Sequence, residues 1–193
     1  QNFTTATDAY NTAVGFQAGV AVTTGTSNTL IGGLAGDAIT TGASNVAVGI
    51  NSLGSNQTGS NSVAIGNGAL FGQVGSGNMF NVGVGADAGQ AITTGIRNTL
   101  IGGLAGDALT DADSNVAIGY LALSGDTLGS KSTAIGVGAL ESQNFTTATD
   151  AYNTAVGFDA GVSVTTGIQN TLIGGQAGQA LTASSDNVAV GPF

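Results

Sequence analysis

Carboxylates are the main side chains of this chain that could take part in catalysis or metal binding. The sequence holds eleven acidic residues but no histidine or cysteine, which excludes catalytic triads, thiolate nucleophiles and the usual zinc sites. Asp111 and Asp113 form a D-x-D pair that could contact calcium, but the Asp-rich nonapeptide of calcium β-rolls is missing. No carboxylate pair recurs in a facing arrangement suited to glycoside hydrolysis. We therefore expect solvated acidic turns, no enzyme activity, no catalytic or metal-binding residue and no cofactor.

Aromatic residues form a second set with chemical potential, because they stack on sugars and pack against protein receptors. They gather in the two longest connections of the chain, residues 67–81 and 137–153. The candidate residues there are Phe71, Met79, Phe80, Phe145 and Tyr152, with Phe3 and Tyr10 at matching positions near residue 1. Two readings stay open: these residues contact a receptor, or they brace an oligomer at regular intervals.

The charge balance narrows the range of partners. Arg97 and Lys131 are the only basic residues, and the net charge is −9. Such a chain cannot neutralise a phosphate backbone or bind an anionic lipid surface, so we expect no nucleic-acid partner. No apolar run approaches the roughly 18 residues that span a bilayer, so we expect no membrane insertion by this segment.

An internal repeat organises the whole chain. Words such as NTAVG, NTLIG and NVAIG recur, and most of their final glycines lie 17 residues apart. These glycines are Gly15, Gly32, Gly49, Gly66, Gly85, Gly102, Gly119, Gly136, Gly157, Gly174 and Gly191. Every fourth interval is longer, so we predict one repeat array over residues 1–193 with super-repeats at about 15–84, 85–156 and, in part, 157–193. The abundant glycines therefore indicate a folded repeat and not a disordered linker.

The columns of the repeat predict an all-β fold, a parallel β-solenoid with eleven coils of about 17 residues. The residue before each glycine is Val or Ile, and we predict that this column is a buried stack. Its members are Val14, Ile31, Val48, Ile65, Val84, Ile101, Ile118, Ile135, Val156, Ile173 and Val190. Three residues after the glycine stands Ala or Ser, where only a small side chain should fit. We expect each coil to run as strand, tight corner, short second strand and turn.

Leucines suggest that several chains associate. A coil this thin has little room inside, so we expect a group of leucines to lie outside it and to be buried in a parallel homotrimer. These are Leu34, Leu53, Leu70, Leu104, Leu121, Leu123 and Leu140. The alternative is a monomeric solenoid that is wide enough to enclose them.

Two stretches carry a resemblance to known families. GSKSTAIGVGAL at residues 129–140 and NSVAIGNGAL at 61–70 resemble the head repeats of trimeric autotransporter adhesins, and NTAVGFQAGVAVTTGTSN at 11–28 is similar to 17-residue repeats of phage tail-fibre proteins. The resemblance implies a left-handed β-roll built as a homotrimer. It also implies an extracellular place, on a virion tail fibre or a bacterial cell surface.

These observations favour a structural and adhesive fibre segment that attaches to a host-surface glycan or protein receptor. The alternative is a self-assembling extracellular scaffold filament that associates end to end and binds no receptor. An ice-binding protein is a further alternative, against which the corner position of the TTG words argues. Because the chain starts at Gln1 and ends inside a coil, we expect it to be a segment of a longer array.

Overall fold

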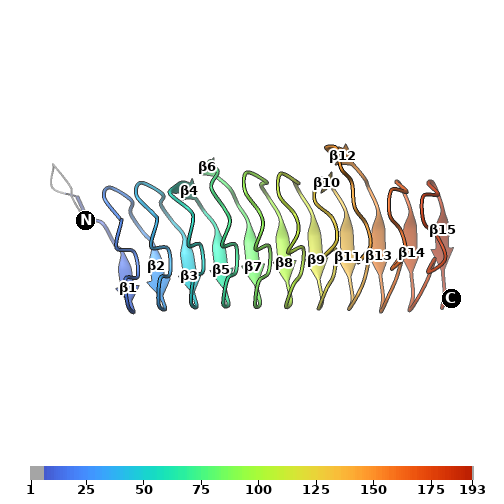
Figure 1. Ribbon diagram of the computed structural model, residues 1–193, viewed down its shortest axis with the longest axis horizontal. Helices are drawn as coiled ribbons and strands as arrows, with labels where there is room; N and C mark the ends of the chain where they lie inside the picture. Colours follow the sequence, from blue (N-terminus) through green and yellow to red (C-terminus); the bar gives the residue numbers. More distant parts are fainter. Residues whose placement is uncertain (1–6, 193) are drawn as a thin grey trace.

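Residues 7–192, which the computed structural model describes, wind as a parallel β-solenoid without a helix (Figure 1). Each coil gives one three-residue strand to a single parallel sheet of eleven strands, in which residues 17 apart, such as Thr12 and Thr29, are paired. The strands are β1 (Thr12–Val14), β2 (Thr29–Ile31), β3 (Val46–Val48), β5 (Val63–Ile65), β7 (Val82–Val84), β8 (Thr99–Ile101), β9 (Val116–Ile118), β11 (Thr133–Ile135), β13 (Thr154–Val156), β14 (Thr171–Ile173) and β15 (Val188–Val190). The predicted all-β solenoid of eleven coils is confirmed.

The second strand predicted for every coil is wrong. After the corner glycine the chain runs through tight turns, which stack on the turns of the next coil through backbone hydrogen bonds. Further strands form only around the two longest connections: β4 (Thr58–Ser60) pairs with β6 (Ser76–Asn78), and β10 (Gly129–Ser130) pairs with β12 (Thr149–Asp150). These small sheets lie at the top of the rod in Figure 1, beyond the N-terminal ends of the strands of the large sheet.

The corner glycines are required by both conformation and space. All eleven have φ between 128° and 140°, a region that side chains rarely allow. A Cβ on Gly102 would lie 2.5 Å from the carbonyl oxygen of Gly119 in the next coil. The coils therefore stack closely at this corner only because no side chain is present there.

The predicted buried stack of Val and Ile is wrong, because this column faces outward. Ile31 is 39% exposed, Val14 is 58% exposed, and none of the column is buried. The residues concerned are Val14, Ile31, Val48, Ile65, Val84, Ile101, Ile118, Ile135, Val156, Ile173 and Val190. A strand of three residues directs its middle side chain to one face and its two outer side chains to the other. The middle residue is the one that points into the coil, and Ala64 and Leu100 in that column are fully buried.

The leucines that we expected outside the coil lie largely within it. Leu53, Leu70, Leu123 and Leu140 are fully buried, and Leu34, Leu104 and Leu121 are partly buried. The coil encloses them because the strand residue that faces them is small. The predicted column of small residues, such as Ala35 and Ala69, is buried as expected.

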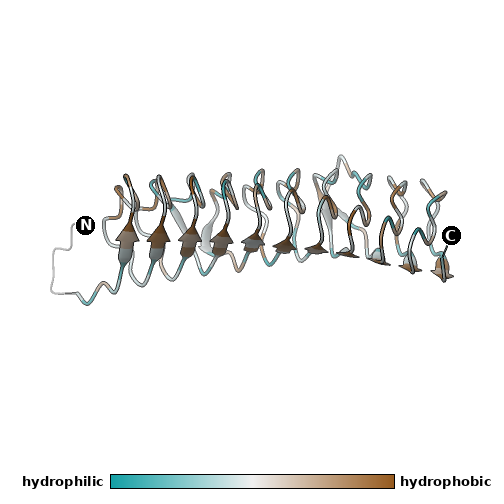
Figure 2. Cartoon of the chain, turned by 90° about the horizontal axis from the view of Figure 1, so that it is seen from below, coloured by the Kyte–Doolittle hydropathy of each residue, from teal (hydrophilic) through white to brown (hydrophobic). Residues whose placement is uncertain are grey.

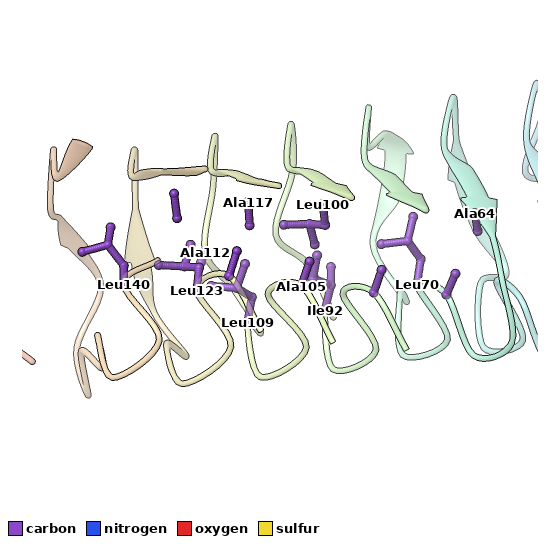
Figure 3. Packing of buried hydrophobic residues seen from close by; sticks show 14 of the residues in the cluster. Ala64, Leu70, Ile92, Leu100, Ala105, Leu109, Ala112, Ala117, Leu123 and Leu140 are labelled. Carbon is purple, nitrogen blue, oxygen red and sulfur yellow. The ribbon is translucent and has the colours of Figure 1, made fainter. Parts of the chain in front are cut away.

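Side-chain volume alternates between two positions of the core, the middle of the strand and the residue four after the corner glycine (Figure 3). In seven coils, a leucine in the strand comes with glycine at the second position, and an alanine in the strand comes with leucine at the second position. The pairs are Leu30/Gly36, Leu100/Gly106 and Leu172/Gly178, and Ala47/Leu53, Ala64/Leu70, Ala117/Leu123 and Ala134/Leu140. A Cβ added to Gly106 would lie 2.8 Å from a methyl group of Leu100. Each of these seven coils thus has one leucine at this place, from either side, whereas coils one, five and nine have none.

A ladder of buried asparagines closes the start of each strand. Asn45 donates from Nδ2 to the carbonyl of Gly59 at 2.9 Å, and its Oδ1 accepts the backbone N–H of the next rung, Ser62, at 3.0 Å. Serine replaces asparagine in every fourth coil, and there Gln73 completes the ladder. The Gln73 Oε1 accepts from the hydroxyl of Ser62 at 3.2 Å and from Nδ2 of Asn81 at 3.0 Å. In every fourth coil, therefore, a glutamine amide takes the place of the asparagine amide in the ladder.

Candidate interaction surfaces

The outer face of the eleven-stranded sheet is a regular surface that includes every coil of the rod. We call it the sheet face; it consists of the first and third residues of every strand, which are Thr or Val followed by Val or Ile. None of these residues is charged. Seen from below, the strands form a continuous hydrophobic band along the rod (Figure 2). In solution such an uncharged, apolar strip marks a contact surface.

One edge of the sheet face follows the corner glycines, and we call it the glycine edge. Its large side chains stand directly after the corner and are exposed by 44% to 73%. They are Phe16, Ile50, Tyr120, Val137 and Phe158. This set is not among the candidate residues predicted from the sequence. The column after the corner glycine could have indicated it, because this column holds either a large apolar residue or a small one.

The opposite edge lies one residue before the asparagine ladder, and we call it the asparagine edge. All eleven residues of this column have φ between 50° and 63°. Its large members are Tyr10, Phe80, Arg97, Lys131 and Tyr152. Both basic residues of the chain therefore lie on one edge of the sheet, among aromatic residues.

The structure separates the aromatic candidates of the long connections into two groups. Phe71, Phe80 and Tyr152 are exposed by 40%, 52% and 52%. Met79 and Phe145 are buried, so direct receptor contact by these two is wrong. A Cβ on Gly129 would lie 2.7 Å from the ring of Phe145, because the ring fills the space over this glycine. Phe3 lies outside the described residues.

Lys131, Asp150 and Tyr152 form an exposed cluster on the asparagine edge. The ammonium of Lys131 lies 2.6 Å from the Asp150 carboxylate and 3.2 Å from the Tyr152 hydroxyl, and 5.2 Å from the centre of the tyrosine ring. The hydrogen bond to Asp150 raises the pKa of Lys131, and the same bond lowers the pKa of Asp150. An exposed pair of this kind contributes little to stability.

The acidic residues are dispersed over the rod. Asp113 accepts the backbone N–H of Ile96 at 2.8 Å, as a carboxylate on a turn does, while Asp111 is exposed. Burial raises the pKa of Asp107, and the neighbouring Asp87 carboxylate adds to this rise. Between residues 7 and 192, no group of three or more acidic side chains is arranged to hold a metal ion.

Asp126 is the one fully buried carboxylate of the described residues. It accepts hydrogen bonds from the backbone N–H groups of Gly129 and Phe145, at 3.0 and 3.1 Å, and from Nε2 of Gln143 at 2.6 Å. All of these donors belong to the chain itself. The carboxylate therefore anchors the connection 137–153 to the coil below.

In the part of the chain that is described, no helix is long and apolar enough to cross a membrane. Comparison of the chain with protein-family models, with curated proteins and with solved structures finds no match. The fold defines the chain as a β-solenoid built from tandem repeats. Its function has to be argued from its surfaces.

Proposed function

We propose that this chain is a segment of an extracellular fibre, a homotrimeric rod that attaches a virion tail or a bacterial cell to a host surface. The observation that carries the proposal is the sheet face, which is uncharged, apolar and equally spaced along the rod. Three such faces turned toward a common axis would remove their Val and Ile side chains from water. Burial of this kind stabilises association without a larger core in each chain.

The adhesive part of the proposal rests on the connections between every fourth coil and the next. Phe71 in the first of them is exposed and belongs to no strand of the sheet face, so a trimer would leave it available as a contact for a glycan or a protein. Three chains and repeated connections would make weak contacts additive through effective concentration. The labelled trimer should therefore bind host cells far more tightly than a monomeric variant does.

The oligomeric state tests the proposal directly. We expect the protein to sediment at three times the chain mass of 18.4 kDa. The double variant Ile101→Asp, Ile135→Asp should remain folded, because both side chains face solvent in the single chain. In a trimer it would bury six carboxylates without partners, at a cost of several kcal/mol per charge, roughly. It should therefore sediment as a monomer.

The control is Thr94→Asp with Thr166→Asp, two exposed turn positions outside the sheet face, which should stay trimeric. A wild-type protein that sediments as a monomer would refute the trimer. A trimer that survives both carboxylates would show that the sheet face is not its interface.

An ice-binding role has one observation in its favour. The first residue of the strand is threonine in six of the eleven strands, which places hydroxyl and methyl groups in a regular array on the sheet face. A trimer would cover this array. Thermal hysteresis in a protein that sediments as a monomer would support ice binding; without it, the scaffold filament is the remaining alternative.

A further inference from the structure

We infer that in the trimer the asparagine edge of each protomer packs against the glycine edge of the next protomer, and that the aromatic residues of the two edges meet along this seam. This inference rests on the trimer that we propose above. It goes further, because it names which residues join the protomers and assigns a contact to aromatic rings that lie outside the core of a single chain.

Symmetry determines which edges can meet. In a ring of three protomers with their sheet faces toward the axis, every contact is heterologous, so one surface meets a different surface of the neighbour. Each sheet face has two edges, so the left edge of one protomer must meet the right edge of the next. An isologous contact, with like edges together, would form a dimer and not close a ring of three.

Backbone strain on the asparagine edge points to the same role. Tyr10, Phe80 and Tyr152 have φ of 50–53°, a left-handed conformation that is costly for a bulky residue. Leucines such as Leu53 adopt it as well, but they are buried and fill the core. The three aromatic residues are at least 52% exposed and are not part of the core. A neighbouring chain that covers these rings would explain why exposed aromatic side chains stand on a strained backbone.

The sizes of the facing residues are complementary at the centre of the rod. Within coils five to seven, Phe80 stands at the level of Ala86, Arg97 at the level of Gly103, and Ser114 at the level of Tyr120. A large side chain on one edge thus meets a small one on the other. In coils one and nine both edges are aromatic: Tyr10 with Phe16, and Tyr152 with Phe158. Aromatic pairs pack favourably edge to face.

Charge is complementary across the same seam. Both basic residues lie on the asparagine edge, whereas Asp87 and Asp159 follow the glycine edge directly. Arg97 forms no ion pair within residues 7–192, and its Nε donates only to the hydroxyl of Ser114 at 3.3 Å. In its own chain, Asp87 lies one coil before Arg97 and at the opposite edge of the sheet. Across a seam between two protomers, Asp87 would lie within reach of Arg97.

Engineered cysteines test the seam, because the chain has none of its own. The double variant Tyr152→Cys, Phe158→Cys places one thiol on each edge of coil nine. Strand β13 separates the two positions in one chain by about 13 Å or more, well beyond the Cα separation of about 7 Å that a disulfide tolerates. Only a neighbouring chain can complete the bond, and both positions are exposed, so the coil should still fold.

We expect mild oxidation to convert the double variant into a covalent trimer on a denaturing gel, while each single variant stays monomeric on that gel. The control Gln90→Cys, Thr166→Cys has two exposed thiols in coils five and nine outside both edges, and it should not cross-link. A protein that sediments as a trimer but forms no cross-link, or whose single variants form dimers, would overturn the seam and leave the trimer intact. A protein that sediments as a monomer would overturn both.

Discussion

The exchange of a leucine between two sides of the core can be tested in coil six. Leu100 comes from strand β8, and Gly106 stands opposite it on the turn. The double variant Leu100→Ala, Gly106→Leu moves the leucine to the side that it occupies in coil seven, where Ala117 faces Leu123. The perturbation changes the element that supplies the leucine and adds one methyl group, that of the new alanine at position 100, to the two side chains together.

The structure sets the magnitudes. Leu100 is fully buried, so Leu100→Ala alone should cost about 2–5 kcal/mol. In Gly106→Leu alone, the new Cβ would lie 2.8 Å from methyl groups of both Leu100 and Leu109, and overpacking of this kind costs about 1–3 kcal/mol. The left-handed backbone at position 106 adds about 1–2 kcal/mol. Independent effects would therefore sum to about 4–10 kcal/mol.

We expect the double variant to lose about 2–5 kcal/mol, less than the sum, because the new leucine fills the space that the old one leaves while the contact with Leu109 and the left-handed backbone remain. A repeat array need not unfold in one step, so amide hydrogen exchange of coils five to seven is the suitable measure, with the thermal midpoint as a check. A double variant that loses as much as the sum of the single variants would refute the exchange of volume between the two positions.

Two further predictions concern buried carboxylates. Burial raises the pKa of Asp107 above its ordinary value of 3.8, so its ionised form destabilises the fold, and this penalty appears as the pH rises through the raised pKa. Asp107→Asn should raise the thermal midpoint at pH 7 but not below pH 3.8, where the carboxyl is protonated in both the folded and the unfolded chain, and an equal rise at both pH values would contradict this account. Asp126→Ala should lower the thermal midpoint strongly, because it leaves two buried backbone N–H groups without this acceptor, at about 1–3 kcal/mol each, and leaves Nε2 of Gln143 with the Ser132 hydroxyl alone. An Asp126→Asn variant, which keeps one acceptor oxygen, should lose less, and equal losses would contradict this account.

The repeat predicted the coils but not which side of the strand faces the core. The spacing of the corner glycines, the small column after them and the parallel stacking are all explicit in the sequence. Both sides of the strand are apolar, however, so hydropathy could not choose between Ile101 and Leu100. The uniform column of Val and Ile before the corner glycine predicts the core. The column that forms the core, in the middle of the strand, varies between leucine, alanine and glycine.

The sequence does contain a signal for the core, which is the linked variation of the residues at two positions of the repeat. In seven coils a leucine in the strand comes with glycine at the second position, and an alanine in the strand comes with leucine there, as expected of closely packed neighbours. Ser62 and Gln73 vary in the same linked way, since the glutamine appears in the coils where the ladder asparagine is lost. The depth of Phe145 could not be predicted, because the path of a single long connection has no repeat to compare with.

The stacking of the coils has a mechanical consequence for a chain pulled at its ends. Each coil adds about 4.8 Å to the rod, yet its seventeen residues extend to about 55–60 Å once they are pulled straight. The hydrogen bonds between coils run along the rod, so tension loads them one coil at a time, from an end inward. A rod of this construction unfolds coil by coil from an end. Each released coil becomes more than about ten times as long as its contribution to the length of the folded rod.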